Sequence, residues 1–264
     1  ALGVEGAALA TVIARVVEMT ILVAVVYAGK GVLAASLKEL TDVTFEFVKK
    51  SYHTILPVIL NDICWGLASL VYIAVYGRMG TQAVAAIQIC NTINNLFMVV
   101  IYGLSSAAAV MVGNSIGAGK ESLSNDYARR FSLLSVVAGI VLGLLLAATT
   151  PLMLSAFNVS DTVRSNSRII LYIISGIFFI RVLGIMLIVG ILRGGGDATR
   201  ALIIEAFTMW CIGVPLTILG AFVFHLPVYL VYALAVFEEV FKCIFAMMRL
   251  KSGRWINNVT HNMT

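Results

Sequence analysis

Residues 169–191 read IILYIISGIFFIRVLGIMLIVGI, and Arg181 is the single charged residue among them. A helix needs ~20 predominantly apolar residues to cross the hydrocarbon core of a bilayer. Further stretches of the same character recur along the chain. We therefore predict membrane-crossing helices near 4–28, 53–76, 82–112, 131–150, 169–191, 200–224 and 228–249.

The composition of the whole chain agrees with these spans. Hydrophobic residues make up 61% of the 264 residues and charged residues 12%, with a mean hydropathy of +1.01. A soluble domain is about a quarter charged. A chain this apolar would expose too much hydrocarbon surface if it folded in water. The sequence predicts an all-α integral membrane protein with about seven transmembrane helices.

Basic residues are distributed unevenly between the connectors, and cytoplasmic loops carry Lys and Arg in excess. One set of connectors holds only Arg78, Arg164 and Arg168. The other set (29–52, 114–130, 192–200 and 249–264) holds Lys30, Lys38, Lys49, Lys50, Lys120, Arg129, Arg130, Arg193, Arg200, Arg249, Lys251 and Arg254. We therefore expect a cell (inner or plasma) membrane protein with residue 1 outside and the C-terminus in the cytoplasm. The net charge of +5 reflects this topology and does not predict a nucleic-acid partner.

Two predicted helices each carry a stripe of polar and aromatic residues at steps of three or four. The stripes are Asp62, Trp65, Ser69, Tyr72 and Tyr76 in the second helix, and Gln88, Asn91, Asn95, Met98, Tyr102 and Ser105 in the third. Unsatisfied amides in hydrocarbon cost several kcal/mol, so both stripes should face the interior of the bundle. They either line a cavity or form hydrogen bonds between helices.

Asp62 is the strongest candidate for ion coupling, because a carboxylate at membrane depth is costly and usually functional. It could exchange a proton or bind Na⁺ with neighbouring oxygens. Its neighbour Asn61 faces another direction on the helix. No other metal site is expected.

Other ionisable residues in the spans have structural interpretations as well. Glu238 and Lys242 are four residues apart, beside Glu239, and can form an internal ion pair. Arg181 needs a partner from another helix, with Glu238, Glu239 or Asp62 as candidates. Glu205 lies nearer the cytoplasmic end and is expected to extend towards the interface.

Glycine and proline mark further positions in the predicted helices. Pro215 should bend the sixth helix, either as a mobile hinge or as a static kink. Gly139 and Gly143 would allow close approach of a neighbouring helix. The glycine runs at 113–119 and 194–196 lack the context of a nucleotide site and predict tight turns. No nucleophile–base pair or metal cluster predicts an enzyme.

Several motifs, in their order, resemble the multidrug and toxic compound extrusion (MATE) family. These are VEGAALAT at 4–11, GLSSAA at 103–108, VGNSIGAG at 112–119, ILRGGGD at 191–197 and SGRW at 252–255. The resemblance spans nearly the whole chain. It implies a twelve-helix exporter of two six-helix lobes that expels cationic or amphipathic organic compounds in exchange for Na⁺ or H⁺.

The resemblance also implies a domain organisation. Residues 1–28 correspond to the last helix of an N-terminal lobe, 29–52 to an amphipathic cytoplasmic linker, 53–250 to a six-helix C-terminal lobe and 251–264 to a cytoplasmic tail. The expected partners are therefore the lipid bilayer, a small organic substrate and a missing N-terminal lobe of the same transporter. No cofactor is implied beyond the coupling ion.

The coupling site expected from the resemblance is incomplete. Asp62 stands where the Na⁺-coupled members carry an acidic residue, but 181–183 (Arg-Val-Leu) contain no second carboxylate. Coupling then rests on Asp62 alone, on Glu238 or Glu239, or on the missing lobe. The cavity candidates are Trp65, Tyr72, Gln88, Asn91, Asn95, Tyr102 and Arg181. A lipid-linked oligosaccharide flippase of related fold and a seven-helix receptor remain alternatives.

Overall fold

The structure is a computed structural model that describes residues 3–29, 34 and 45–257. Most of the predicted amphipathic linker helix (29–52) and the end of the tail lie outside the described residues. The chain divides into two compact units, residues 1–50 and 51–264. Each unit is described separately below.

The first unit contains helix α1 (Gly3–Ala28), which confirms the helix predicted at 4–28. Most of its residues are apolar, and its charged residues are Glu5, Arg15 and Glu18. Residues 8–28 form a candidate membrane span by length and hydropathy. Arg15 and Glu18 are 2.8 Å apart, so these two charges neutralise each other locally.

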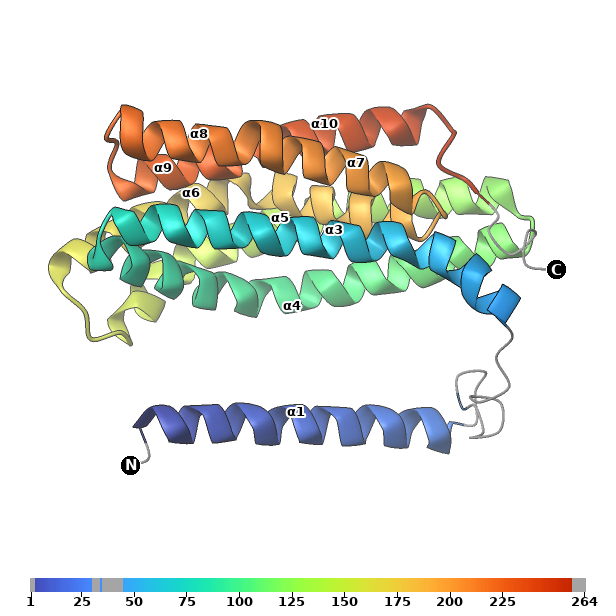
Figure 1. Ribbon diagram of the computed structural model, residues 1–264, viewed down its shortest axis with the longest axis horizontal. Helices are drawn as coiled ribbons and strands as arrows, with labels where there is room; N and C mark the ends of the chain where they lie inside the picture. The colour runs from blue at the N-terminus through green and yellow to red at the C-terminus, as the bar shows by residue number, and fades with distance from the viewer. Residues whose placement is uncertain (1–2, 30–33, 35–44, 258–264) are drawn as a thin grey trace. The chain divides into compact units, whose positions relative to one another are not determined.

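The second unit is a bundle of long helices joined by short connectors (Figure 1). Its first four helices are α3 (Phe45–Arg78), α4 (Thr81–Gly117), α5 (Glu121–Ser155) and α6 (Asp161–Ile185). Helix α6 continues without a break into the π-helical segment η1 (Met186–Arg193). These helices extend beyond the predicted spans, because their polar ends continue past the apolar windows.

The C-terminal part of the bundle is less regular. It comprises α7 (Ala198–Thr208), η2 (Met209–Gly213), α8 (Val214–Ile218), η3 (Leu219–Val223), α9 (Val228–Val236) and α10 (Glu238–Lys251). The first four of these follow one another without a connector and together form the predicted sixth crossing. Pro215 lies in α8, directly after the π-helical turn η2, in which the amide of Val214 donates to the carbonyl of Met209. The helix is therefore irregular beside Pro215, as its missing amide requires.

The described residues contain six helical spans that are long and apolar enough to cross a membrane. They confirm a multi-pass, all-α membrane protein. The predicted crossing at 228–249 is helical but is not one continuous helix, because α9 ends at Val236 and α10 begins at Glu238. The break places Glu238 and Glu239 in the first turn of α10, where the helix dipole favours carboxylates.

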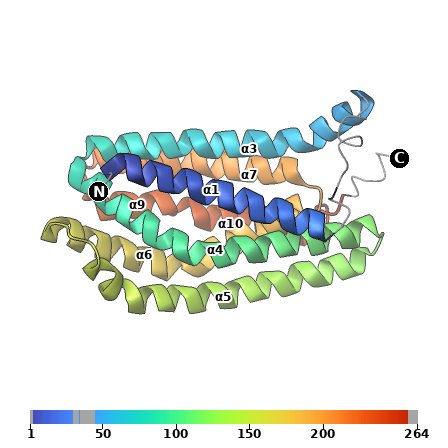
Figure 2. The ribbon, with the colours of Figure 1, turned by 90° about the horizontal axis from the view of Figure 1, so that it is seen from below.

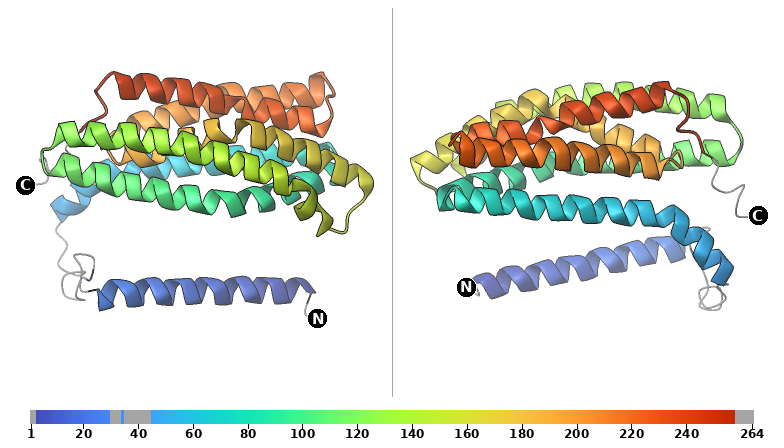
Figure 3. Two further views of the ribbon diagram at one scale, coloured as in Figure 1. Left: turned by 180° about the vertical axis from the view of Figure 1, so that it is seen from behind. Right: turned by 45° about the horizontal axis from the view of Figure 1, so that its top comes forward.

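The central helix of this unit is α6, which contacts α4, α5, α9 and α10 (Figure 3). Helices α3 and α7 lie along one edge of the unit and α5 along the opposite edge (Figure 2). The core between them is apolar, with Phe97 and Phe178 in edge-to-face contact at 6.4 Å. The predicted close approach at Gly139 and Gly143 is confirmed: Cβ atoms there would lie 2.5 Å from the Phe179 Cα and 2.7 Å from the Ser175 carbonyl oxygen.

The two glycine runs form tight turns, as predicted. Gly119 and Gly196 both adopt positive φ angles, of 72° and 81°, which favour glycine. The second turn is covered by the start of the tail, where the fully buried ring of Trp255 lies against Gly195. Arg249 donates to Asp197 at 2.5 Å and joins the end of α10 to the same turn.

Candidate functional site

A polar cavity of about 420 Å³ opens within the second unit. Its lining comes mainly from α3, α4, α6, α9 and α10. All the residues predicted for a cavity take part in it, together with Glu238 and Glu239: Trp65, Tyr72, Gln88, Asn91, Asn95, Tyr102 and Arg181. The helical spacing of these residues therefore brings side chains from both predicted stripes into the same cavity.

The two stripes do not enter the cavity along their whole length. Met98 and Ser105 of the α4 stripe are fully buried instead, in contact with protein. Asn94, which lies one residue from the stripe, lines the cavity and is 4% exposed. Its side-chain oxygen is buried and has no hydrogen-bond partner within the described chain. The sequence sign of this role was that Asn94 directly precedes Asn95, which belongs to the predicted stripe.

Asp62 does not line the cavity. Its side chain is 69% exposed, and its ionic partner is Arg193 of η1, whose Nη2 lies 3.5 Å from Asp62 Oδ1. The inward position at this level of α3 belongs to Asn61, which is 3% exposed. The prediction that Asp62 faces the interior was therefore wrong. The inward-facing residue is its direct neighbour, which is rotated by about 100° around the helix axis.

Asn61 reaches Glu205 of α7, and its Nδ2 donates to Glu205 Oε2 at 2.6 Å. The Glu205 side chain is 16% exposed and points into the bundle, so the prediction that it extends towards the interface was wrong. The reason is electrostatic: Arg193 and Lys242 both lie within 4.0 Å of its carboxylate. Sequence spacing could not reveal these partners, because they come from η1 and α10.

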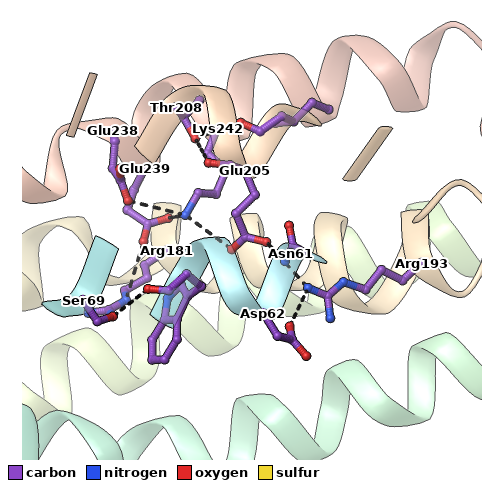
Figure 4. A network of polar contacts seen from close by, with 12 residues as sticks. Asn61, Asp62, Ser69, Arg181, Arg193, Glu205, Thr208, Glu238, Glu239 and Lys242 are labelled. Carbon is purple, nitrogen blue, oxygen red and sulfur yellow. Dashed lines mark hydrogen bonds and ion pairs between the residues drawn. The ribbon is translucent and has the colours of Figure 1, made fainter. Parts of the chain in front are cut away.

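Lys242 is the centre of a network of charges, shown in Figure 4. Its Nζ lies 3.4 Å from Glu239, 3.7 Å from Glu238 and 3.9 Å from Glu205. The predicted pair of Glu238 and Lys242 is thus present, as part of a larger cluster. A buried ammonium group is stable only when carboxylates compensate its lost hydration.

Arg181 has one of its three predicted partners. Its Nε lies 3.9 Å from Glu239 Oε1, so Glu239 contacts both Arg181 and Lys242. Arg193, which the sequence places at the start of an expected cytoplasmic connector, is 20% exposed and contacts Asp62 and Glu205. Every carboxylate of the cluster therefore has a cationic neighbour.

Gly213 lets the network form close to the backbone of η2. A Cβ atom at this position would collide with the Glu238 carboxylate and the Tyr72 hydroxyl group. The Tyr72 hydroxyl donates to Glu238 Oε2 at 3.4 Å. The glycine thus allows α3 and α10 to meet beside the irregular helix that contains Pro215.

Other features of the described residues do not form a comparable site. A second hollow of about 440 Å³ lies on α5 and α6, but its lining is almost entirely apolar and contains no Asp, Glu, His, Lys or Arg. Cys64, Cys90, Cys211 and Cys243 are all free, and Cys211 is exposed rather than buried. No group of His, Cys, Asp and Glu within the described residues has a metal-binding arrangement.

Membrane-crossing helices around a polar, charge-lined cavity define a multi-pass membrane protein of the transporter class. The chain belongs to the MatE family, whose model matches residues 57–219. The members of this family are transporters rather than enzymes.

Individual relatives agree with this assignment. The probable multidrug resistance protein NorM of Thermotoga maritima is 22% identical over 96% of this chain and 54% of its own length. A mutant of the Vibrio cholerae MATE transporter VcmN has a TM-score of 0.80 at 18% identity, over 98% of this chain and 57% of its own.

A more distant fold relative is a transporter of the MOP superfamily from Pyrococcus furiosus. It gives a TM-score of 0.72 at 17% identity, over 76% of this chain and 44% of its own length. Its binding pocket is described as reversed in polarity, which suggests a different function for that protein. The present chain spans about half the length of the relatives it matches.

Proposed function

We propose that this chain supplies one lobe of an exporter that expels cationic or amphipathic organic compounds in exchange for Na⁺ or H⁺. The observation that carries the proposal is the polar cavity, lined by aromatic, amide and carboxylate side chains inside a MatE-family bundle. Such a cavity can hold the polar groups of an organic molecule while its helices cross the membrane.

The cavity offers two kinds of surface to a substrate. Trp65, Tyr72 and Tyr102 supply aromatic faces, which attract apolar groups and organic cations. The amides of Gln88, Asn91 and Asn95 can donate and accept hydrogen bonds on the facing helix. A lining of this kind suits amphipathic molecules of varied shape better than a single rigid ligand.

In the proposed exchange of substrate for an ion, the charged residues of this cavity would act together with a second lobe of the transporter. Glu238 and Glu239 are the coupling candidates in the cavity, and Asp62 is exposed beside Arg193. In the proposed cycle an N-terminal lobe faces this one, and the two lobes alternate around a shared cavity. Pro215 and η2 supply a place where the sixth crossing could bend. The proposed orientation has the C-terminus in the cytoplasm, following the excess of basic residues in one set of connectors.

The oligosaccharide flippase is less well supported. A pyrophosphate group would need free positive charge in the cavity. Among the described residues that line it, Arg181 and Lys242 both contact carboxylates. Membership of a transporter family likewise gives no support to the seven-helix receptor.

The test is dye efflux from cells or vesicles that contain the whole transporter, under separate Na⁺ and H⁺ gradients. We expect efflux above that of empty membranes, driven by one of the two gradients. Glu239→Gln should slow it strongly, because this change leaves Arg181 without its carboxylate. Trp65→Ala should alter the range of dyes transported. Absence of gradient-driven efflux with a correctly inserted protein would refute the proposal.

A further inference from the structure

The cluster around Lys242 has the composition of a cation site. Three carboxylates, from Glu205 on α7 and from Glu238 and Glu239 on α10, have an oxygen within 4.0 Å of one point. Carboxylate and amide oxygens are the ligands that hard metal cations prefer. The point where their oxygens converge is the ammonium nitrogen of Lys242, which is 7% exposed.

A further oxygen lies beside these carboxylates. Asn61 is 3% exposed, its Nδ2 donates to Glu205, and its Oδ1 has no hydrogen-bond partner among the described residues. Oε2 of Glu239 is buried and likewise has no hydrogen bond within the described chain, although Lys242 Nζ is 3.4 Å away. Glu239 Oε2 is therefore an acceptor next to the ammonium group, and Asn61 Oδ1 is a second buried acceptor on a residue that contacts Glu205.

Each buried carboxylate of the cluster already has a cationic neighbour. Lys242 contacts Glu238, Arg181 contacts Glu239, and Arg193 contacts both Glu205 and the exposed Asp62. A metal ion placed where the three buried carboxylates converge would lie next to the ammonium group of Lys242, and like charges repel each other strongly in a low-dielectric setting. The donor set with Lys242 in place therefore does not fit Na⁺, one of the two coupling ions that the family resemblance implies.

We infer that the side chain of Lys242 is the resident cation of this carboxylate cluster and keeps Na⁺ and other monovalent metal ions out of it. Lysine suits this role because its ammonium group is a compact point charge on a flexible stem. The inference concerns the coupling ion and to that extent rests on the proposed function. It predicts that removal of the ammonium group converts the cluster into a metal-cation site.

The experiment measures the thermal unfolding of the whole purified transporter while Na⁺ replaces choline at constant ionic strength. A ligand that binds only the folded state raises the unfolding midpoint in proportion to the logarithm of its concentration above the dissociation constant. Lys242→Met should acquire such a rise, of a few degrees. Lys242→Arg, which keeps the positive charge, should not acquire it. The double variant Lys242→Met with Glu238→Gln, which removes one positive and one negative charge together, should show a smaller rise than Lys242→Met.

Two results would overturn the inference. One is a folded Lys242→Met protein whose midpoint responds to Na⁺ no more than the unmodified protein does. The other is a Na⁺ response of the unmodified protein that disappears in Glu205→Gln, since the cluster would then bind Na⁺ in the presence of Lys242. This second comparison does not require Lys242→Met to fold. Both readouts are independent of export, so failure of efflux would refute the proposed function without affecting this result.

Discussion

The side-chain amide of Asn61 donates to the carboxylate of Glu205 at 2.6 Å and so joins α3 to α7. The two residues are far apart in sequence, and both are enclosed by the bundle. Glu205 also contacts Lys242 and Arg193, so the bond connects α3 to the central charge cluster. The position of α3 beside the cavity thus depends on a polar contact as well as on apolar packing.

Asn61→Leu should destabilise the protein. The change removes a donor to a buried carboxylate, which costs ~1–3 kcal/mol. The matched control is Asp62→Leu on the neighbouring, exposed position, which should change stability less. Unfolding of the purified transporter in a denaturing detergent measures both variants. Equal stabilities of the two variants would contradict the role assigned to Asn61.

The contact between Arg181 and Glu239 should be energetically coupled. Arg181→Met leaves Glu239 with Lys242 alone, while Glu239→Gln leaves Arg181 without a charged partner among the described residues. Removal of one partner of a buried pair costs about 3–5 kcal/mol, whereas removal of both is milder. We therefore expect the double variant to be more stable than the sum of the single effects. Purely additive effects in unfolding experiments would show that the two groups do not interact.

Gly143→Ala should weaken the contact of α5 with α6. The added Cβ would lie 2.7 Å from the carbonyl oxygen of Ser175, a backbone atom that cannot rotate away. Overpacking of this kind costs about 1–3 kcal/mol. The control is Gly176→Ala on α6, where a Cβ atom would have no neighbour within 4 Å. The account requires the first variant to unfold more easily than the second.

Trp255→Ala should loosen the turn at residues 194–197. The ring is fully buried against Gly195, and truncation of such a side chain costs about 3–5 kcal/mol. Arg254→Ala, on the exposed neighbouring side chain, is the control. Limited proteolysis near the turn and thermal unfolding compare the two. If Trp255→Ala were as resistant as the control, the contact with Gly195 would be dispensable.

Periodicity in the sequence was sufficient to predict the helices and the part of the cavity lining that comes from α3 and α4 at helical spacing. Residues such as Gln88, Asn91 and Asn95 recur at steps that place them on one face of α4, and a polar face in a membrane helix must turn inward. The succession of helices along the chain could likewise be predicted, from the lengths of the apolar segments and the shortness of the connectors between them. These properties are local, so a single chain contains the information needed to infer them.

The pairings between helices could not be predicted in the same way. Asp62 and Asn61 are adjacent, and the phase of a single helix does not show which of them meets a carboxylate on α7. Glu205 was expected to reach the interface, because its partners Lys242 and Arg193 lie on other segments. The break at Phe237 was missed as well, since no glycine or proline marks it in the sequence.

The most direct test of the account asks whether the cavity is open to water in the intact transporter. Single cysteines replace Asn91, which lines the cavity, and Val141 of α5, which does not, after the native cysteines of the transporter, including the four of this chain, have been changed to serine or alanine. A charged, membrane-impermeant thiol reagent is then applied to both faces of the membrane. The account predicts rapid labelling of the cysteine at 91, slowed by a transported dye, and little labelling at 141. Labelling at 141 with protection at 91 would contradict it.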